Sequence, residues 1–197
     1  MRSAILCMIV SYFIGSVPTG YLTVRLLKDV DIRKIGSGSI GATNVRRVLG
    51  DGWAIFVTVA DMLKGALALL VTAMNGLEPW LLSLSGFAAV MGHNYPFWLK
   101  FRGGKGVATT YGVMFFLWPY ESFAVTLMSG AIWYAIMTGT RYVSLASMIS
   151  MFALPVFFWV LGAPFSFIFV SFALAVFSVC RHKSNIERLA QGSENKV

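Results

Sequence analysis

Residues 53–74 read WAIFVTVADMLKGALALLVTAM, a run of 22 residues whose only charged side chains are Asp61 and Lys64. An α-helix rises 1.5 Å per residue, so a helix of this length crosses the hydrocarbon core of a bilayer, which is about 30 Å thick. Asp61 and Lys64 lie three positions apart and share one helical face. Charges inside a membrane are unfavourable unless they are paired or functional, and we predict a structural role for this pair.

The rest of the chain has the same apolar character. Of its 197 residues, 57% are hydrophobic and only 12% are charged, whereas soluble proteins have about 25% charged residues. The apolar runs are continuous, which disfavours the alternating strands of a membrane barrel. We predict an all-α integral membrane protein with seven transmembrane helices in a single domain, 1–197. The other six predicted helices are Ala4–Leu27, Leu77–Tyr95, Val107–Pro119, Ser122–Thr138, Val143–Leu161 and Pro164–Cys180.

The basic residues predict how the helices are oriented. In a seven-helix arrangement, fourteen of the sixteen Lys and Arg residues fall on one side, Arg2 falls on the other and Lys64 lies within a helix. Because cytoplasmic loops are enriched in basic residues, the N-terminus is predicted outside and the C-terminus in the cytoplasm. The net charge of +8 forms no continuous stripe, so we expect no nucleic-acid partner. Polar residues gather on the inner side in 28–52, 92–106 and 181–197.

The first inner segment contains a glycine-rich run, GSGSIGATN at 36–44, followed by Arg46 and Arg47, either of which could contact a phosphate. It matches G-x-G-x-x-G formally, but a dinucleotide fold needs a preceding strand, and none is predicted. Glycines allow backbone N–H groups to converge as an anion nest, and an arginine fork suits phosphate. We therefore expect Gly38, Thr43, Asn44 and their neighbours to bind a phosphate. The alternative is a flexible interfacial loop whose arginines contact anionic lipid.

The other two segments also suit anionic ligands. Gly103-Gly104-Lys105-Gly106 precedes an apolar helix, where the helix N-terminus and a lysine attract an anion. The alternative is a turn in an interfacial aromatic belt.

The third segment contains a histidine and an asparagine. If the seventh helix continues, His182 and Asn185 share one face, and the histidine can move a proton. The alternative is a stop-transfer tail. His93 and His182 are the only histidines, and we predict no metal site.

These three segments closely resemble the signature motifs of the bacterial acyl-phosphate-dependent glycerol-3-phosphate acyltransferases, the PlsY family. Ser39 departs from the family's usual Asn, and Arg46 is an additional cation beside the matching Arg47. The matching residues are Gly36-Ser37-Gly38, Gly41-Ala42-Thr43-Asn44-Val45 and Arg47, then Gly92-His93, Pro96, Phe101 and Gly103-Gly104-Lys105-Gly106-Val107-Ala108-Thr109, then Arg181-His182, Asn185-Ile186, Arg188-Leu189, Gly192 and Glu194.

The resemblance implies an enzyme of the bacterial cytoplasmic membrane. Such an enzyme moves a fatty acyl group from acyl phosphate to the 1-hydroxyl of glycerol 3-phosphate, giving lysophosphatidic acid and inorganic phosphate at its cytoplasmic face. We expect a monomer without a cofactor, whose partners are the two substrates and the bilayer. The expected catalytic residues are Ser37, Arg47, His182 and Asn185; the expected phosphate-binding residues are Gly38, Thr43, Asn44, Gly103, Gly104, Lys105 and Gly106; the expected structural residues are Asp61, Lys64 and Glu194.

Acyl phosphate is already an activated donor, so the protein has to orient the hydroxyl and stabilise developing charge rather than supply a nucleophile. Either His182 or a substrate phosphate can accept the hydroxyl proton. Two other classes of protein are alternatives. A transporter of a phosphorylated anion predicts polar residues on both faces, and the outer face has few. A purely structural bundle leaves the three polar segments unexplained.

Overall fold

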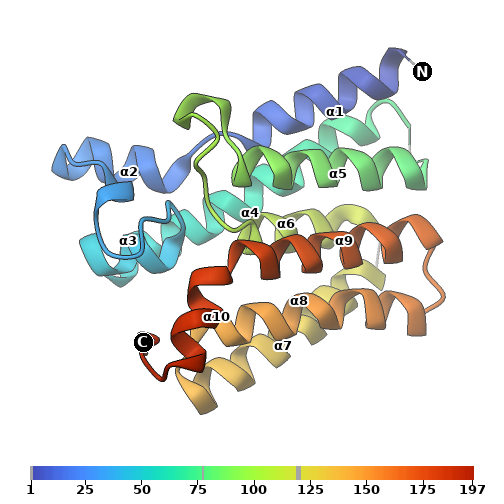
Figure 1. Cartoon of the computed structure of the whole chain (residues 1–197). Coiled ribbons are helices and arrows are strands. Elements are labelled where there is room, and N and C mark those ends of the chain that lie inside the picture. Colours follow the sequence, from blue (N-terminus) through green and yellow to red (C-terminus); the bar gives the residue numbers. More distant parts are fainter. Residues whose placement is uncertain (1, 77, 119–120) are drawn as a thin grey trace. The chain divides into compact units, whose positions relative to one another are not determined.

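The computed structural model describes residues 2–76, 78–118 and 121–197, and the regular elements within these ranges are all helices (Figure 1). The helices are α1 (Arg2–Gly15), α2 (Thr19–Lys28), η1 (Ile32–Lys34), α3 (Ala42–Leu49), α4 (Asp51–Ala73), α5 (Pro79–Asn94), η2 (Phe97–Leu99), α6 (Val107–Leu117), α7 (Glu121–Thr140), α8 (Val143–Val160), α9 (Phe165–Arg181) and α10 (Lys183–Ala190).

Every predicted apolar segment contains a helix, which confirms the all-α prediction, although the predicted ends Leu77 and Pro119 lie outside the described residues. The first segment is divided between α1 and α2, because Pro18 has no N–H to continue the helical ladder. By length and composition, Ala4–Lys28, α4, α7 and α8 can each cross a membrane, and α9 with α10 would be a fifth, bent span. The count of seven spans and their orientation stay predictions.

The described chain forms two compact units, Met1–Val113 and Met114–Val197. In the first unit, α1 lies along α5, α4 packs against both, and α2 and α3 lie beside the first part of α4 (Figure 1). In the second unit, α7, α8 and α9 pack in chain order, and α10 follows α9. The single domain predicted for 1–197 stays a prediction.

Helix α4 buries its charged pair and exposes large apolar side chains on its other face. Asp61 and Lys64 are buried, whereas Leu63, Leu67 and Leu70 on the other side of the helix are each at least half exposed. A helix in water shows the opposite arrangement, because water solvates charges and excludes leucine. This inverted pattern is typical of a helix whose outer face contacts lipid.

Glycines allow helices of the first unit to approach closely. A Cβ atom added to Gly15 of α1 would overlap the backbone of Ala89 in α5, and one added to Gly92 of α5 would overlap the carbonyl oxygen of Tyr12 in α1. Helices α4 and α6 meet in the same way at Gly65. Between lipid-facing helices, backbone packing of this kind replaces the hydrophobic effect as a source of association.

Candidate active site

The glycine-rich loop between η1 and α3 is a tight turn. Gly36 and Gly38 have φ angles of 59° and 69°, in the left-handed region that glycine adopts readily. The N–H of Gly38 donates to the carbonyl of Ile35 at 3.1 Å, and the N–H of Ser37 donates to the side-chain Oδ1 of Asn44 at 3.1 Å. The side chain of Ser37 is exposed at the tip of this turn.

Asn44 organises this loop from inside. It is almost fully buried, and its Nδ2 donates to the carbonyl oxygens of Ile35 and Ser39, both at 2.9 Å, and of Ile32 at 3.3 Å. The N–H of Gly41 is also used locally, because it donates to Oγ of Ser39. These backbone N–H groups therefore have acceptors within the loop and its neighbouring helix, and Asn44 supports the loop. Phosphate binding by Gly38, Thr43 and Asn44 stays a prediction.

The two neighbouring arginines of α3 have different surroundings. Arg46 forms an ion pair with Asp51. The side chain of Arg47 is exposed and runs past the loop, since its Cδ would lie 3.7 Å from a Cβ atom added to Gly36. Arg47 is therefore the arginine that lies beside Ser37, as the motif resemblance implies. Thr43, in the first turn of α3, is partly exposed.

The second loop, between η2 and α6, is held by the end of α5. The N–H of Gly103 donates to the carbonyl of Asn94 at 3.2 Å, and the N–H of Gly104 donates to the carbonyl of His93 at 3.1 Å. These two N–H groups therefore hold the loop against the end of α5. Lys105 is partly exposed and directly precedes Gly106 and α6. The first turn of a helix has N–H groups without intrahelical acceptors, which are suited to an anion.

The first and second loops are joined within the first unit. Arg33 of η1 donates through Nη1 to the carbonyl of Leu99 in η2 at 3.1 Å, and Leu99 packs into the same buried cluster as Ile32 and Ile40. Asp31 accepts from Arg33 at 2.7 Å. The hydrogen bond from Arg33 lowers the pKa of Asp31 to about 2. This contact joins the loop that carries Ser37 to the loop that carries Lys105, and α3 with Arg47 directly follows the first of these loops. Sequence reasoning did not single out Arg33.

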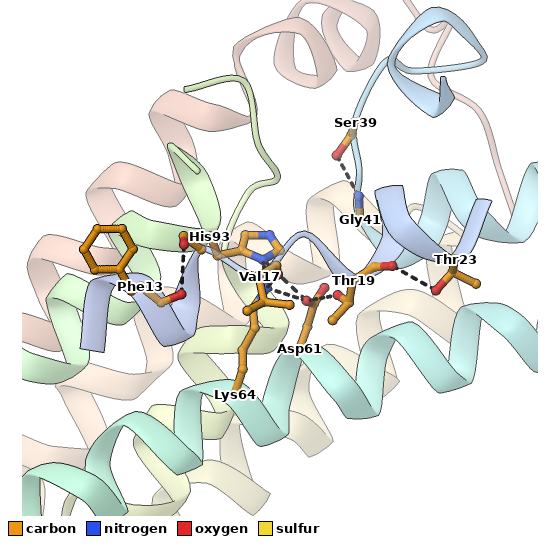
Figure 2. A network of polar contacts seen from close by, with 10 residues as sticks. Phe13, Val17, Thr19, Thr23, Ser39, Gly41, Asp61, Lys64 and His93 are labelled. Carbon is orange, nitrogen blue, oxygen red and sulfur yellow. Dashed lines mark hydrogen bonds and ion pairs between the residues drawn. The ribbon is translucent and has the colours of Figure 1, made fainter. Parts of the chain in front are cut away.

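A buried polar cluster lies directly beneath the second loop (Figure 2). Nζ of Lys64 lies 2.7 Å from Oδ1 of Asp61, 2.9 Å from the carbonyl oxygen of Val17 and 2.9 Å from Nδ1 of His93. Thr19 donates its hydroxyl to the Asp61 carboxylate. The Asp61–Lys64 pair is therefore present, as predicted. The participation of His93 was not predicted, although its motif had been noted.

The third motif lies in the second unit at a bend. Helix α9 ends at Arg181 and α10 begins at Lys183, with a 61° angle between them. The seventh helix therefore does not continue straight through His182, and the helix predicted to end at Cys180 ends one residue later. His182 occupies the joint, and the N–H of Asn185 donates to its carbonyl at 2.8 Å, so the two residues remain one turn apart.

The ring of His182 is buried and has a defined tautomer. Its Nδ1 lies 2.7 Å from the carbonyl oxygen of Ser178, which can only accept a hydrogen bond. Nδ1 therefore carries the proton, and in the neutral ring Nε2 has a lone pair that can take a proton from a hydroxyl. This is the protonation state that a general base requires.

Glu194 ties α10 to α8. It accepts from Nδ2 of Asn185 at 2.6 Å, from Oγ of Ser144 at 2.8 Å and from Nε of Arg188 at 2.7 Å. Burial alone would raise the pKa of Glu194, but these hydrogen bonds and the positive charge of Arg188 outweigh it, so the pKa is lowered. Because a carboxylate only accepts, it also orients the Asn185 amide with its NH₂ toward Glu194.

Comparison with known proteins identifies the family. The glycerol-3-phosphate acyltransferase family model matches residues 5–192. The chain is 42% identical over 196 residues to a glycerol-3-phosphate acyltransferase of Parasynechococcus marenigrum (strain WH8102), covering 99% of this chain and 90% of that one. It is 39% identical over 194 residues to that of Aquifex aeolicus (strain VF5), covering 98% of each chain.

Solved structures agree with this assignment. The fold is similar to the crystal structure of PlsY (YgiH), described as an integral membrane glycerol 3-phosphate acyltransferase, in its glycerol 3-phosphate form. The TM-score is 0.92 at 39% sequence identity, covering 99% of this chain and 96% of that chain. The lysophosphatidic acid form of PlsY gives a TM-score of 0.89 at 37% identity, covering 98% and 95%. This protein is an integral membrane protein, and it belongs to the glycerol-3-phosphate acyltransferase family.

Proposed function

We propose that the chain transfers a fatty acyl group from acyl phosphate to the 1-hydroxyl of glycerol 3-phosphate, giving lysophosphatidic acid and inorganic phosphate. The observation that carries this proposal is the joining of two cation-bearing loops through Arg33 and Leu99. Both proposed substrates bear a phosphate. Arg47, on the helix that follows the first loop, and Lys105, on the second loop, each supply a positive charge. The choice of acyl phosphate as donor follows from the motif resemblance.

The proposed reaction is a direct acyl transfer. The hydroxyl oxygen of glycerol 3-phosphate attacks the carbonyl carbon of acyl phosphate, and the bond from that carbon to the phosphate oxygen breaks. Inorganic phosphate leaves with the bonding electrons. Ser37, Arg47 and Lys105 bind phosphate oxygens and stabilise the negative charge that develops. Asn185 is proposed as a further catalytic residue, oriented by Glu194.

His182 is the proposed acceptor of the hydroxyl proton. Its hydrogen bond to Ser178 supports this role, because it leaves the lone pair on Nε2. A substrate phosphate has a second pKa near 6 and is the competing acceptor. Kinetics of a His182 variant distinguish the two, as described in the Discussion.

The proposed location is the bacterial cytoplasmic membrane, with seven spans, the N-terminus outside and the site on the cytoplasmic face. The distribution of basic residues supports this orientation. We further propose that the protein acts as a monomer.

A donor assay tests the proposal. Purified protein is incubated with glycerol 3-phosphate and, separately, with acyl phosphate, acyl-CoA or acyl carrier protein carrying the same acyl chain. Released phosphate and lysophosphatidic acid are measured. We expect turnover with acyl phosphate and equal amounts of the two products. Turnover with acyl-CoA alone, and none with acyl phosphate, would refute the proposed donor.

A further inference from the structure

The Gly103–Gly106 loop rests on His93 in two ways. The carbonyl of His93 accepts the N–H of Gly104 at 3.1 Å. The imidazole ring lies against the Cα of the same glycine, because a Cβ atom added to Gly104 would overlap Nε2 and lie 2.9 Å from Cδ2 and Cε1. The position of His93 therefore determines where Gly104 and the adjacent Lys105 can lie.

The ring of His93 is in turn oriented by Lys64. An ammonium group has three donors and no acceptor, and those of Lys64 have acceptors in Asp61, the carbonyl of Val17 and Nδ1 of His93. Because Nδ1 accepts from an ammonium, it carries no proton. The neutral ring must therefore carry its proton on Nε2, the nitrogen that lies against Gly104.

Asp61 keeps this arrangement in place. Its Oδ1 lies 2.7 Å from Nζ of Lys64 and 3.6 Å from Nδ1 of His93, and all three side chains are at least nine-tenths buried. A buried ammonium needs such a counter-charge. A second proton on His93 would place an N–H against the Lys64 ammonium, so the ring stays neutral. Asp61 and Lys64 on α4 and His93 on α5 thereby hold Nε2 of the His93 ring against Gly104.

We propose that the buried Asp61–Lys64–His93 cluster positions the Gly103–Gly106 loop for substrate binding, with His93 held as the neutral Nε2-protonated tautomer. His93 is a positioning residue in this proposal, acting through Gly104 and Lys105. The two histidines of the chain then have opposite tautomers, since His182 carries its proton on Nδ1. The kinetic part rests on the proposed function, in which this loop binds a substrate phosphate; the tautomer does not.

Nitrogen NMR tests the tautomer directly. The chain has two histidines, so protein labelled with ¹⁵N-histidine in lipid nanodiscs gives two pairs of ring signals, and His182→Gln assigns the pair of His93. We expect His93 to show a protonated Nε2 and an unprotonated Nδ1. A protonated Nδ1 on His93 in the wild-type protein would overturn the proposal. This result is independent of catalytic activity and of the donor used.

Kinetics with two isosteric variants test the positioning role. In His93→Asn the amide can replace Nδ1 but leaves no atom at Nε2, whereas His93→Gln places an amide near Nε2. Loss of a hydrogen bond to a charged group weakens binding about 10- to 100-fold, so we expect His93→Asn, which no longer supports the loop, to raise KM for glycerol 3-phosphate by about that factor with a smaller change in kcat. His93→Gln is expected to restore part of the loss. Equal KM values for wild type and His93→Asn would overturn the positioning role.

A charge-neutral double variant separates positioning from stability. Lys64→Met alone leaves Asp61 buried without a counter-charge, so it is combined with Asp61→Asn. We expect the double variant to melt closer to the wild type than Lys64→Met does, while KM stays raised because the ring has lost its orienting donor. A wild-type KM in the double variant would show that the cluster only stabilises the fold. If the double variant does not fold, the two His93 variants decide.

Thr72→Val is the matched control for these variants. Thr72 is a fully buried polar residue on the same helix, and it contacts Ser11 rather than the loop. We expect the KM of Thr72→Val to be unchanged even if its melting temperature falls. A raised KM would mean that replacing any buried polar residue of α4 weakens substrate binding. That result would overturn the specific role of the cluster. If wild-type protein fails to use acyl phosphate, the proposed function fails, but the NMR prediction can still be judged.

Discussion

Replacing Glu194 with Gln should destabilise the second unit by an amount that its contacts allow to be estimated. The carboxylate accepts from Asn185, Ser144 and Arg188 at 2.6–2.8 Å. An amide of the same shape has one acceptor oxygen and one NH₂ group. Whichever way the introduced amide turns, its NH₂ faces the donor of Arg188 or that of Asn185, so at least one contact becomes repulsive.

The expected magnitude follows from the lost charged hydrogen bond. Hydrogen bonds to charged groups contribute roughly 1.5–3 kcal/mol, and Arg188 is 32% exposed, so we take about 2 kcal/mol, the lower part of that range. For a chain of this size, 1 kcal/mol corresponds to about 2–4 °C in Tm. Glu194→Gln is therefore expected to lower Tm by about 4–8 °C. We also expect kcat to fall, because the Asn185 amide loses its orientation.

The dependence of this effect on pH provides a second test. Since the folded-state pKa of Glu194 is lowered, its stabilising contribution is fully present above the unfolded-state pKa of about 4.3 and is lost as the pH falls through the lower folded-state value. The Tm difference between wild type and Glu194→Gln should therefore be constant from pH 8 to about 5 and shrink below about 4.

Thermal denaturation in detergent, followed by circular dichroism, measures these effects. Glu187→Gln is the matched control, because Glu187 lies on the same helix, α10, and is exposed. Its Tm should not change. The reasoning would be refuted if Glu194→Gln melted no lower than Glu187→Gln at pH 7, or if the difference between them grew as the pH was lowered.

Three further predictions concern the site and the topology. His182→Gln is expected to lower kcat by about 10²- to 10⁴-fold, the usual contribution of a general base, with KM nearly unchanged; a rise in KM alone would assign His182 to binding and the proton to a substrate phosphate. Gly104→Ala is expected to raise KM, because the added Cβ overlaps His93, whereas the control Gly130→Ala meets open space in α7 and should leave KM unchanged. In a variant without Cys7 and Cys180, Glu78→Cys should react with an impermeant maleimide on intact spheroplasts and Lys34→Cys should not; the reverse labelling would invert the proposed orientation.

The helices were predictable because lipid imposes a simple rule on sequence. Every backbone group within a bilayer needs an internal partner, so a long apolar run becomes a helix whatever its tertiary contacts. The positions at which these helices break or bend were less predictable. Pro18 divides the first segment, and its effect follows from its missing N–H. The bend at His182 has no comparable local cause, because neither proline nor glycine stands at that position.

The roles of individual polar groups depended on contacts that no local pattern contains. The carbonyls that accept from Gly103 and Gly104 belong to the end of α5, and the amide that accepts from Ser37 belongs to α3. The sequence predicted that the loops present backbone N–H groups to a ligand. In the fold, several of these N–H groups donate hydrogen bonds to other parts of the protein. Arg46 is paired with Asp51, whereas Arg47, which matches the family motif, is exposed. The catalytic role of Arg47 stays a prediction.

The site residues that sequence reasoning missed, Arg33 and His93, contact partners far away in the sequence. Arg33 contacts a carbonyl 66 positions away, and His93 contacts Lys64, 29 positions away. The Asp61–Lys64 pair could be predicted because helical spacing places its members together. Asp31, two positions before Arg33, was a usable sign that Arg33 has a structural partner.

The close crossing of α1 and α5 has a consequence for membranes of different thickness. Because a Cβ at Gly15 or Gly92 would overlap the opposing backbone, neither helix can slide along the other without forcing its neighbouring side chains into that backbone. A change in bilayer thickness is then accommodated by tilting both helices together or by local deformation of the bilayer, and not by sliding one helix past the other. Gly92 directly precedes His93, so the second loop keeps its height relative to α1 rather than to the lipid. We therefore expect acyl transfer to persist in short-chain and long-chain lipids alike.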